Sequence, residues 1–368
     1  MTARASVPGL SKSPALRRLA GIGACVIAVF AYSSTVASAS SSPPAGATTS
    51  AAARTASTGT TLPGTKCPVF PADNIWNTKV TALPVDSHSK AWLKTMDAAG
   101  TYLHPDYGPG GGKKTPYGIP YVVVSPGQAL VAVKFEYASQ SDKGPYPFSA
   151  STPIEGGQSA SGDRHAIMVN PKTCKLYELY QAHYKPHGKS TAGSGAIWSL
   201  TSNKLRPAGW TSADAAGLPI LPGLVSYAEV MSGHIDHAIR FTAQTSDEAY
   251  LWPARHEAGA GKNANYPPMG ARFRLNASFS LSNSQCASAC QTVITAMKQY
   301  GLILADNGSN WYFQGTTTSS WTYTMVNQLK QIPAREFVAV NESSLECFPN
   351  SGQARRTGAP DNGCPPSS

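Results

Sequence analysis

The stretch Gly233-His234-Ile235-Asp236-His237-Ala238-Ile239-Arg240-Phe241 alternates polar and apolar side chains with the two-residue period of a β-strand. A strand here places His234, Asp236 and Arg240 on one face. The other face is mostly apolar and includes His237, which we expect to be a core residue. A polar face backed by an apolar one is typical of the floor of a cleft, so the stretch predicts both a sheet and a site.

Outward from this stretch, short β-type runs separated by turn residues dominate the chain. The run Leu130–Tyr137 alternates clearly, which indicates a sheet with one solvated face. We therefore expect a mostly β protein, with a β-sandwich or jelly-roll-like body and a few peripheral helices. The other expected strands are Tyr121–Val124, Ala166–Asn170, Leu176–Tyr180, Ile235–Ala243, Tyr250–Trp252, Ala271–Leu275, Leu302–Leu304, Trp311–Gln314 and Phe337–Val340.

Three helices are expected from their apolar spacing and end signals. Cys286–Tyr300 carries one apolar stripe, and Gly301 follows where a left-handed C-cap belongs. Ser226-Tyr227-Ala228-Glu229 fits a capping box for a helix that ends at Gly233, and a third helix covers 89–99. Asp306-Asn307-Gly308 predicts a tight turn between two strands.

The ends of the chain predict export. Residues 1–39 combine basic residues, an apolar run and a small-residue cleavage pattern, which is typical of a signal peptide. Arg17-Arg18 keeps the twin-arginine route open, although Sec export fits better. The Ser/Ala/Thr-rich segment 40–63 predicts a disordered tether, 64–349 a single β-rich globular domain, and 350–368 a Gly/Pro/Ser-rich tail. We expect a secreted, extracellular monomer without stable membrane insertion.

Charge and cysteine content narrow the function classes. Removing residues 1–39 takes away four positive and no negative charges, which lowers the net charge from +10 to +6. No basic cluster is interleaved with aromatics, so nucleic acid is not expected as a partner. Six cysteines remain, an even number that predicts three disulfides in an exported protein: Cys67, Cys174, Cys286, Cys290, Cys347 and Cys364. Cys286 and Cys290 lie one helical turn apart, so we expect each to pair with a different segment.

Two His/Asp groups could carry chemistry. The first contains His234, Asp236, His237 and His256, with Arg240 and Arg255 nearby. An aspartate can orient an imidazole as a general base or complete a metal site, but Asp236 and Arg240 could equally form a structural ion pair. The second contains Asp163 and His165, which enter the strand Ala166–Asn170 on one face. We expect the two groups to meet across one groove, unless Asp163 only begins a solvated strand.

Aromatic residues offer contacts for sugar rings. The long Gly/Pro-rich loop 194–223 holds Trp198 and Trp210, and Trp311 follows the predicted 306–308 turn. Burial against the sheet is the alternative for Trp198 and Trp210. A glycosidase requires two neighbouring carboxyl groups, so the few acidic residues of the chain are candidates for acid/base catalysis. Asp306 fits the role of a turn former better. These candidates are Asp163, Asp236, Glu257 and Asp306.

Seven segments together resemble a family of secreted bacterial proteins, common in actinobacteria, that has no characterised activity. The resemblance covers nearly all of the mature domain and implies export and bacterial origin, but no catalytic role. Its segments are Asn74-Ile75-Trp76-Asn77, Tyr117-Gly118-Ile119-Pro120-Tyr121, Gly162-Asp163-Arg164-His165, the 194–223 loop, Ile235-Asp236-His237-Ala238-Ile239-Arg240-Phe241, Trp252-Pro253-Ala254-Arg255-His256 and Ile303-Leu304-Ala305-Asp306-Asn307-Gly308.

These features favour a secreted enzyme acting on extracellular or cell-wall polysaccharide, as a glycoside hydrolase or a lyase. In this hypothesis His165, His234, Asp163 and Asp236 are the catalytic candidates. Arg240, Arg255, His256, Trp198, Trp210 and Trp311 are the substrate contacts. No cofactor is expected, and a divalent metal at the His/Asp group is a disfavoured alternative. A non-catalytic glycan-binding or cell-envelope structural protein is the rival. Serine-hydrolase, nucleotide-binding and zinc-protease motifs are absent from the sequence.

Overall fold

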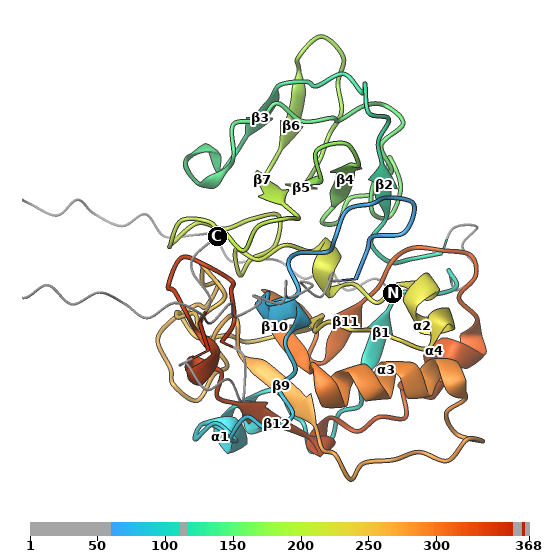
Figure 1. Ribbon diagram of the computed structural model, residues 1–368, viewed down its shortest axis with the longest axis vertical. Coiled ribbons are helices and arrows are strands. Elements are labelled where there is room, and N and C mark those ends of the chain that lie inside the picture. Colours follow the sequence, from blue (N-terminus) through green and yellow to red (C-terminus); the bar gives the residue numbers. More distant parts are fainter. Residues whose placement is uncertain (1–59, 111–115, 356–362, 365–368) are drawn as a thin grey trace, which may run out of the picture. The chain divides into compact units, whose positions relative to one another are not determined.

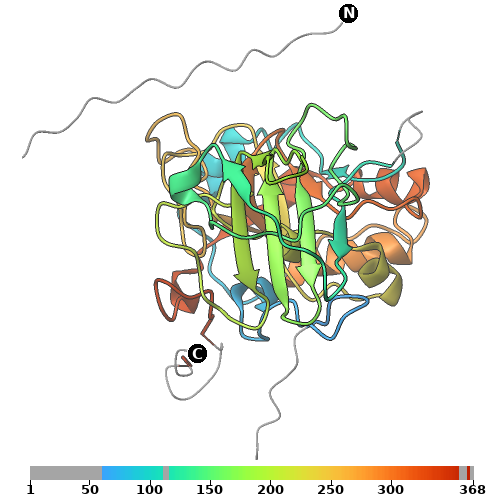
Figure 2. The ribbon, with the colours of Figure 1, turned by 90° about the horizontal axis from the view of Figure 1, so that it is seen from above.

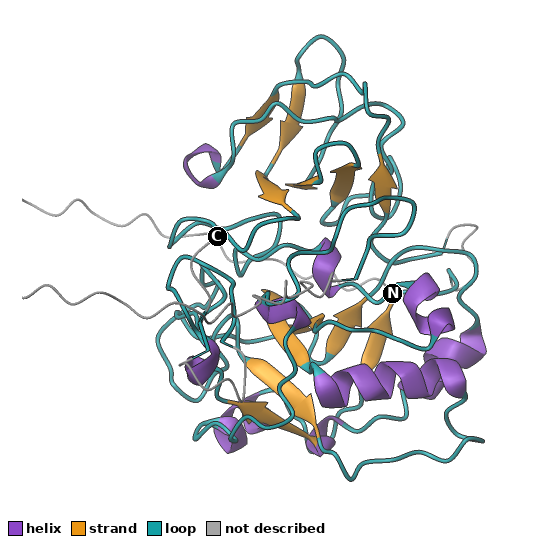
Figure 3. Ribbon diagram, in the orientation of Figure 1, coloured by secondary structure: helices purple, strands orange, loops and turns teal. Residues whose placement is uncertain are grey.

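The computed structural model describes residues 60–110, 116–355 and 363–364 (Figure 1). These described residues belong to one compact unit. The predicted signal peptide and most of the predicted tether lie outside the described residues. Within the described part, strands outweigh helices, which confirms the expected mostly β class (Figure 3). The finer expectation of a sandwich or jelly roll is not confirmed, because the strands form three separate sheets with several parallel pairs.

The largest described sheet has six strands and mixed directions. Its two parallel pairs are β1 with β11 and β8 with β10, and its other neighbours are antiparallel. In spatial order the strands are β1 (His104–Asp106), β11 (Tyr312–Gln314), β8 (Ile239–Ala243), β10 (Leu302–Asn307), β9 (Arg272–Leu275) and β12 (Phe337–Val340).

One face of this sheet is apolar and forms the main core. Phe241, Phe273 and Trp311 pack there with ring centroids 5.4–5.6 Å apart. Helix α3 (Ser288–Gln299) runs along the sheet and contacts β9 (Figure 1). Each fully buried side chain of this size contributes about 2–3 kcal/mol of transfer free energy, so this face anchors the strands whose other face carries polar groups.

A four-stranded sheet lies beyond the polar face of the first one (Figure 1). Its order is β2 (Tyr121–Val123), β4 (Ala166–Asn170), β5 (Lys175–Tyr180) and β7 (Ser194–Ser199). The sheet is buried on both faces: Ile167 and Val169 join the main core, while Ala166 and Met168 join a second cluster around Phe148. A third sheet pairs β3 (Val133–Phe135) with β6 (Ser190–Ala192) in parallel, and Figure 2 shows these strands from above.

The helices are short and lie outside the sheets. Besides α3, the described chain forms α1 (Ser89–Thr95), α2 (Tyr227–Ser232) and α4 (Tyr323–Leu329). Five 3₁₀ turns complete the elements: η1 (Ile75–Asn77), η2 (Ala138–Gln140), η3 (Leu221–Gly223), η4 (Ala334–Glu336) and η5 (Ser343–Leu345). Gly301 follows α3 with φ +71°, which confirms the predicted left-handed cap.

Several local expectations were wrong. The strand expected over Ile235–Ala243 begins only at Ile239, because α2 ends at Gly233 and the chain between is irregular. Ser226 makes no side-chain cap bond, so there is no capping box. The strands on either side of 306–308 are not a hairpin, since β8 lies between them. Tyr250–Trp252 forms only an isolated bridge, and the expected 194–223 loop begins as the strand β7.

Three disulfides are present among the described cysteines: Cys67–Cys174, Cys286–Cys290 and Cys347–Cys364. The expectation that Cys286 and Cys290 pair with different segments was wrong. Helix α3 begins at Ser288, so Cys286 lies outside the helix and its Cα comes within 5.2 Å of that of Cys290. This separation suits a disulfide.

Described residues at both ends pack on the body. Leu62, in the last part of the predicted tether, is buried and its amide donates to the Cys67 carbonyl. Gly352 in the predicted tail donates to the Asn203 carbonyl, and Gln353 is buried. In the described ranges, no helix has the length and apolar character needed to cross a bilayer.

Candidate functional site

Polar side chains occupy the face of the six-stranded sheet that looks away from α3. Asp106 pairs in register with Gln314, and Phe313 pairs with Phe241. Gln314 and Arg240 are the next residues on those antiparallel strands, so they lie side by side. Because paired residues point to the same side of a sheet, Asp106, Gln314 and Arg240 form a polar row across three strands. Burial raises the pKa of Asp106, and the neighbouring Gln314 side chain acts against this rise.

A β-bulge adds a second acidic residue to this face. β10 pairs with β8 in register through Leu304, and the register then shifts so that Asp306, not Ala305, pairs with Thr242. A one-residue shift exchanges the faces of a strand, and the bulge therefore turns Asp306 toward the side of Arg240. The Asp306 Oδ2 atom lies 3.9 Å from Arg240 Nη2.

Arg240 is buried and held by a second carboxylate. Its Nη2 and Nε atoms donate to the two oxygens of Asp214 at 2.6 and 3.1 Å. Both side chains are almost fully buried, at 2% and 0% side-chain exposure. A two-point contact of this kind fixes the guanidinium in one orientation. The Arg240 guanidinium is therefore a fixed positive charge between the carboxyl groups of Asp214 and Asp306.

The loop that carries Asp214 is fastened by buried hydrogen bonds. The Ser212 hydroxyl donates to the Leu218 carbonyl, and the Ser212 amide donates to the Asp214 carbonyl. The Glu178 carboxylate of β5 accepts from the amides of Ile220 and Leu221. At Gly223 a Cβ atom would lie 2.8 Å from Arg240 Cβ and from Trp76. Only glycine permits this close approach of the loop to β8.

His165, which directly precedes β4 of the four-stranded sheet, joins the same network. Its Nδ1 atom lies 2.6 Å from Glu155 Oε2, and its Nε2 atom lies 3.0 Å from the Ala213 carbonyl, next to Asp214. Burial acts to lower the pKa of His165, but the charge and hydrogen bond of Glu155 raise it overall to about 9. At neutral pH both nitrogens are therefore protonated, and each can donate to its acceptor.

Five carboxyl groups gather around these two cations and are termed the acidic cluster: Asp106, Glu155, Asp163, Asp214 and Asp306. Burial, followed by the charge of Asp214, raises the pKa of Asp306 to about 7. Burial also raises the pKa of Asp163, which remains exposed and interacts electrostatically with Glu155 and Asp306. The Asp306 side chain is 27% exposed. The cluster thus contains a protonatable carboxyl group that reaches solvent beside an exposed carboxylate.

Aromatic rings border the acidic cluster. Tyr180, at the end of β5, has its hydroxyl pKa raised by burial and by Asp163 and Asp306. On the six-stranded sheet, His104 and Tyr312 stack at 4.1 Å with an interplanar angle of 12°. The pKa of the exposed Tyr117 is raised by partial burial and by Asp106. Rings of this kind offer flat apolar faces next to polar hydroxyls.

The structure brings together Asp163, His165 and Arg240 but leaves His234 and Asp236 elsewhere. Both of these residues are exposed and lie in the irregular segment before β8. Asp236 is near the end of α3, where the Tyr300 hydroxyl lies 3.4 Å from its Oδ1 atom. The expectation that His234 and Asp236 share a strand face with Arg240 was wrong, because β8 begins only at Ile239.

Arg255 and His256 fasten loops. Arg255 donates to the carbonyls of Arg206 and Pro349 and to the Asn350 side chain. His256 Nδ1 lies 3.0 Å from the Ala215 carbonyl. The Arg255 guanidinium therefore uses its donors within the protein, and the predicted substrate contact is not supported by its position. His256 supports the chain next to Asp214.

Two of the three predicted sugar-stacking tryptophans are buried. Trp311 is fully buried and its indole N–H donates to the Met96 carbonyl. Trp198 is 4% exposed and its indole N–H donates to Glu178. Trp210 is half-buried and lines a surface cavity. Of the three, only Trp210 keeps a substantial surface available for a sugar ring.

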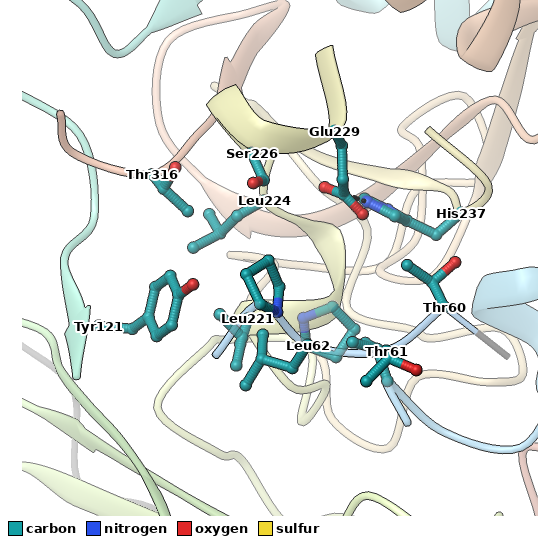
Figure 4. A pocket seen from close by; sticks show the side chains of 13 residues that line it. Thr60, Thr61, Leu62, Tyr121, Leu221, Leu224, Ser226, Glu229, His237 and Thr316 are labelled. Atoms are coloured by element: carbon teal, nitrogen blue, oxygen red, sulfur yellow. Dashed lines mark hydrogen bonds and ion pairs between the residues drawn. The ribbon is translucent and has the colours of Figure 1, made fainter. Parts of the chain in front are cut away.

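His237 is a core residue, as expected. Its Nδ1 atom lies 2.8 Å from the Ala238 carbonyl and its Nε2 atom 3.4 Å from Glu229 Oε2. Figure 4 shows this pair at the wall of a small pocket opposite Tyr121. The pocket holds about 30 Å³, enough for a water molecule but not for a sugar.

Sequence reasoning missed Glu155, Asp214 and Asp106. Asp214 did leave a signal, since it is the only acidic residue in the 30-residue stretch 194–223. Asp106 gave none, because β1 has only three residues and no alternation. Glu257, a predicted carboxylate candidate, caps its own turn by accepting from the Gly259 amide.

No group of three or more His, Cys, Asp or Glu side chains within the described ranges is arranged to hold a metal ion. The chain matches no protein-family model, no curated protein and no solved structure. The resemblance to secreted actinobacterial proteins therefore stays a prediction.

Proposed function

We propose that the protein is a secreted glycoside hydrolase that cleaves extracellular or cell-wall polysaccharide at the acidic cluster. The observation that carries the proposal is the placement of Asp306, a partly exposed carboxyl group 3.9 Å from Arg240, in one cluster with the exposed Asp163. Burial and the Asp214 carboxylate raise the pKa of Asp306 to about 7. Glycoside hydrolysis requires one carboxylic acid to protonate the leaving oxygen and one carboxylate to attack or to activate water. Environments that separate the pKa values of neighbouring carboxyl groups assign these two roles.

In this mechanism Asp306 is the general acid. Burial and the Asp214 carboxylate favour its protonated form, so it can donate a proton to the glycosidic oxygen at slightly acidic to neutral pH. Asp163 is the second carboxylate, since it is exposed and interacts electrostatically with Asp306 from the segment that leads into β4. The His165–Glu155 pair positions the chain that carries Asp163.

Charge favours a hydrolase over a lyase. Five carboxyl groups surround only two cations, Arg240 and His165, and both cations already contact carboxylates. A lyase that removes a proton beside a uronate carboxylate would have to bind an anionic sugar among these negative groups, which repel it. The cluster suits a neutral or cationic sugar unit, with Tyr180 and Tyr312 as ring contacts.

The test is hydrolysis of a panel of plant, microbial and cell-wall glycans, followed as new reducing ends. Asp306→Asn and Asp163→Asn should each lose at least about 100-fold in activity, the usual effect of removing acid/base catalysis. Glu248→Gln is the matched control, because Glu248 is exposed and only its backbone amide forms a hydrogen bond in the described contacts.

Leaving-group chemistry separates the two roles. An aryl glycoside with an acidic phenol needs little protonation, so Asp306→Asn should regain much of its rate on that substrate, whereas Asp163→Asn should not. Equal loss on both substrates would remove Asp306 from the acid role. Glycan retention without new reducing ends would instead support the rival, a non-catalytic glycan-binding protein.

A further inference from the structure

A second cavity lies beside β7. It holds about 850 Å³, within the usual range for ligand sites, and no member of the acidic cluster lines it. Ile197 and Trp198 of β7 form one wall, Lys175 of β5 stands at the neighbouring strand, and the 202–210 segment forms the other side. We term it the β7 cavity.

Two indole rings that both contact one guanidinium group line the β7 cavity. The Arg206 guanidinium lies between the indoles of Trp198 and Trp210, 5.6 and 5.5 Å from their centroids. Arg206 also donates to Asp142 at 2.5 Å and to the carbonyls of Gln140 and Thr211. These hydrogen bonds fix the Arg206 guanidinium, on which the Trp210 ring packs. A fixed support for the ring reduces the entropic cost of binding.

The β7 cavity is positively charged, in contrast to the acidic cluster. Lys175 and Lys204 line it, are exposed, and form no ion pair with any described residue. Asp142 is the single acidic residue of the lining, and its charge is compensated by Arg206. Two uncompensated ammonium groups therefore stand beside an aromatic ring.

We propose that the β7 cavity is a non-catalytic binding site for a uronate-bearing polysaccharide. A pyranose ring would pack on Trp210, and carboxylates of the sugar chain would contact Lys175 and Lys204. Asp142 is engaged by Arg206 and by the Ile197 amide, so the cavity offers no free acid/base pair. The site would hold the protein on an anionic matrix, independently of hydrolysis at the acidic cluster.

The test measures binding of polygalacturonate oligomers by titration calorimetry at low and moderate salt. Lys175→Gln with Lys204→Gln should weaken binding about tenfold and reduce its salt dependence, since two ion contacts are lost. Trp210→Ala should weaken binding in the same assay, with Trp210→Phe retaining most of it. The control is Lys90→Gln with Lys94→Gln on α1, which removes the same charge from exposed positions away from the cavity.

Asp306→Asn should bind as the wild type does, so a failure of the proposed hydrolase would leave this result intact. Equal weakening by the α1 control would show that only net charge matters and would overturn the site. Equal affinity for a neutral glucan would overturn the uronate assignment. So would binding of a glycerol-phosphate polymer in place of polygalacturonate. Thermal melting of each variant shows whether the fold is retained.

Discussion

Replacing Asp306 by Asn should stabilise the protein at alkaline pH while removing its activity. In the folded protein, burial and the Asp214 carboxylate raise the pKa of Asp306 from 3.8 to about 7. The folded state therefore keeps a proton between pH 4 and 7 that the unfolded state releases. Because the folded state binds more protons, the free energy of unfolding of the wild type falls across this window.

A rise of about three pKa units corresponds to about 4 kcal/mol. The side chain is 27% exposed, and solvent screening reduces the expected effect to roughly 2–4 kcal/mol. Asn keeps the shape of Asp306 and carries no charge, so it removes the repulsion from the Asp214 carboxylate. Asp306→Asn should therefore exceed the wild type in unfolding free energy by this amount at pH 8 and by little at pH 4.

Urea denaturation of both proteins at pH 4, 6 and 8 measures the difference directly. His165 interacts electrostatically with Asp306, so the difference between the two proteins includes the effect of the Asp306 charge on His165. Asp236→Asn, an exposed carboxylate, is the control and should differ from the wild type by less than about 0.5 kcal/mol at each pH. A difference that does not change with pH, or a less stable Asp306→Asn protein at pH 8, would refute the reasoning.

Three further outcomes are expected. Asp214→Ala leaves the buried Arg240 without its two-point partner and should cost about 3–5 kcal/mol in urea unfolding; a loss below 1 kcal/mol would show that the pair is not needed. Replacing Cys67 and Cys174 by Ser should cost roughly 5 kcal/mol, against roughly 2 kcal/mol for Cys286 and Cys290, because the linked residues are 107 and 4 positions apart. Equal losses for the two pairs would contradict the loop-entropy argument. His234→Ala and Asp236→Ala should keep wild-type hydrolysis and melting temperature, and a tenfold loss of rate in either would return the 234–236 segment to the mechanism.

Local patterns predicted the strands of the core well. Ala166–Asn170 and Phe337–Val340 form strands with the expected bounds, because their runs of apolar residues are buried and flanked by turn residues. The polar residue Arg240 between Ile239 and Phe241 also predicted correctly that β8 has one polar and one apolar face. These features depend on side-chain period alone.

The arrangement of the site depends on long-range pairing that no local pattern contains. Asp306 faces Arg240 only because β10 shifts register between Leu304 and Asp306. The sequence had predicted a tight turn at 306–308 in place of this bulge. Asp214 reaches Arg240 through a loop held by Glu178, more than 35 residues earlier in the chain. The sequence predicted that Asp163 and His165 lie near Arg240, and they do. It also placed His234 and Asp236 there, but these two residues precede β8 and lie elsewhere.

The pH dependence of kcat/KM on a hydrolysed glycan tests the acidic cluster as an active site most directly, because it reports the ionisation of the free enzyme. The pKa of Asp306, raised by burial and by Asp214, predicts that the rate constant falls about tenfold per pH unit above pH 7. The same fall should be absent for an aryl glycoside with an acidic phenol. A rate constant that stays level from pH 6 to 9 on the natural glycan would contradict the account.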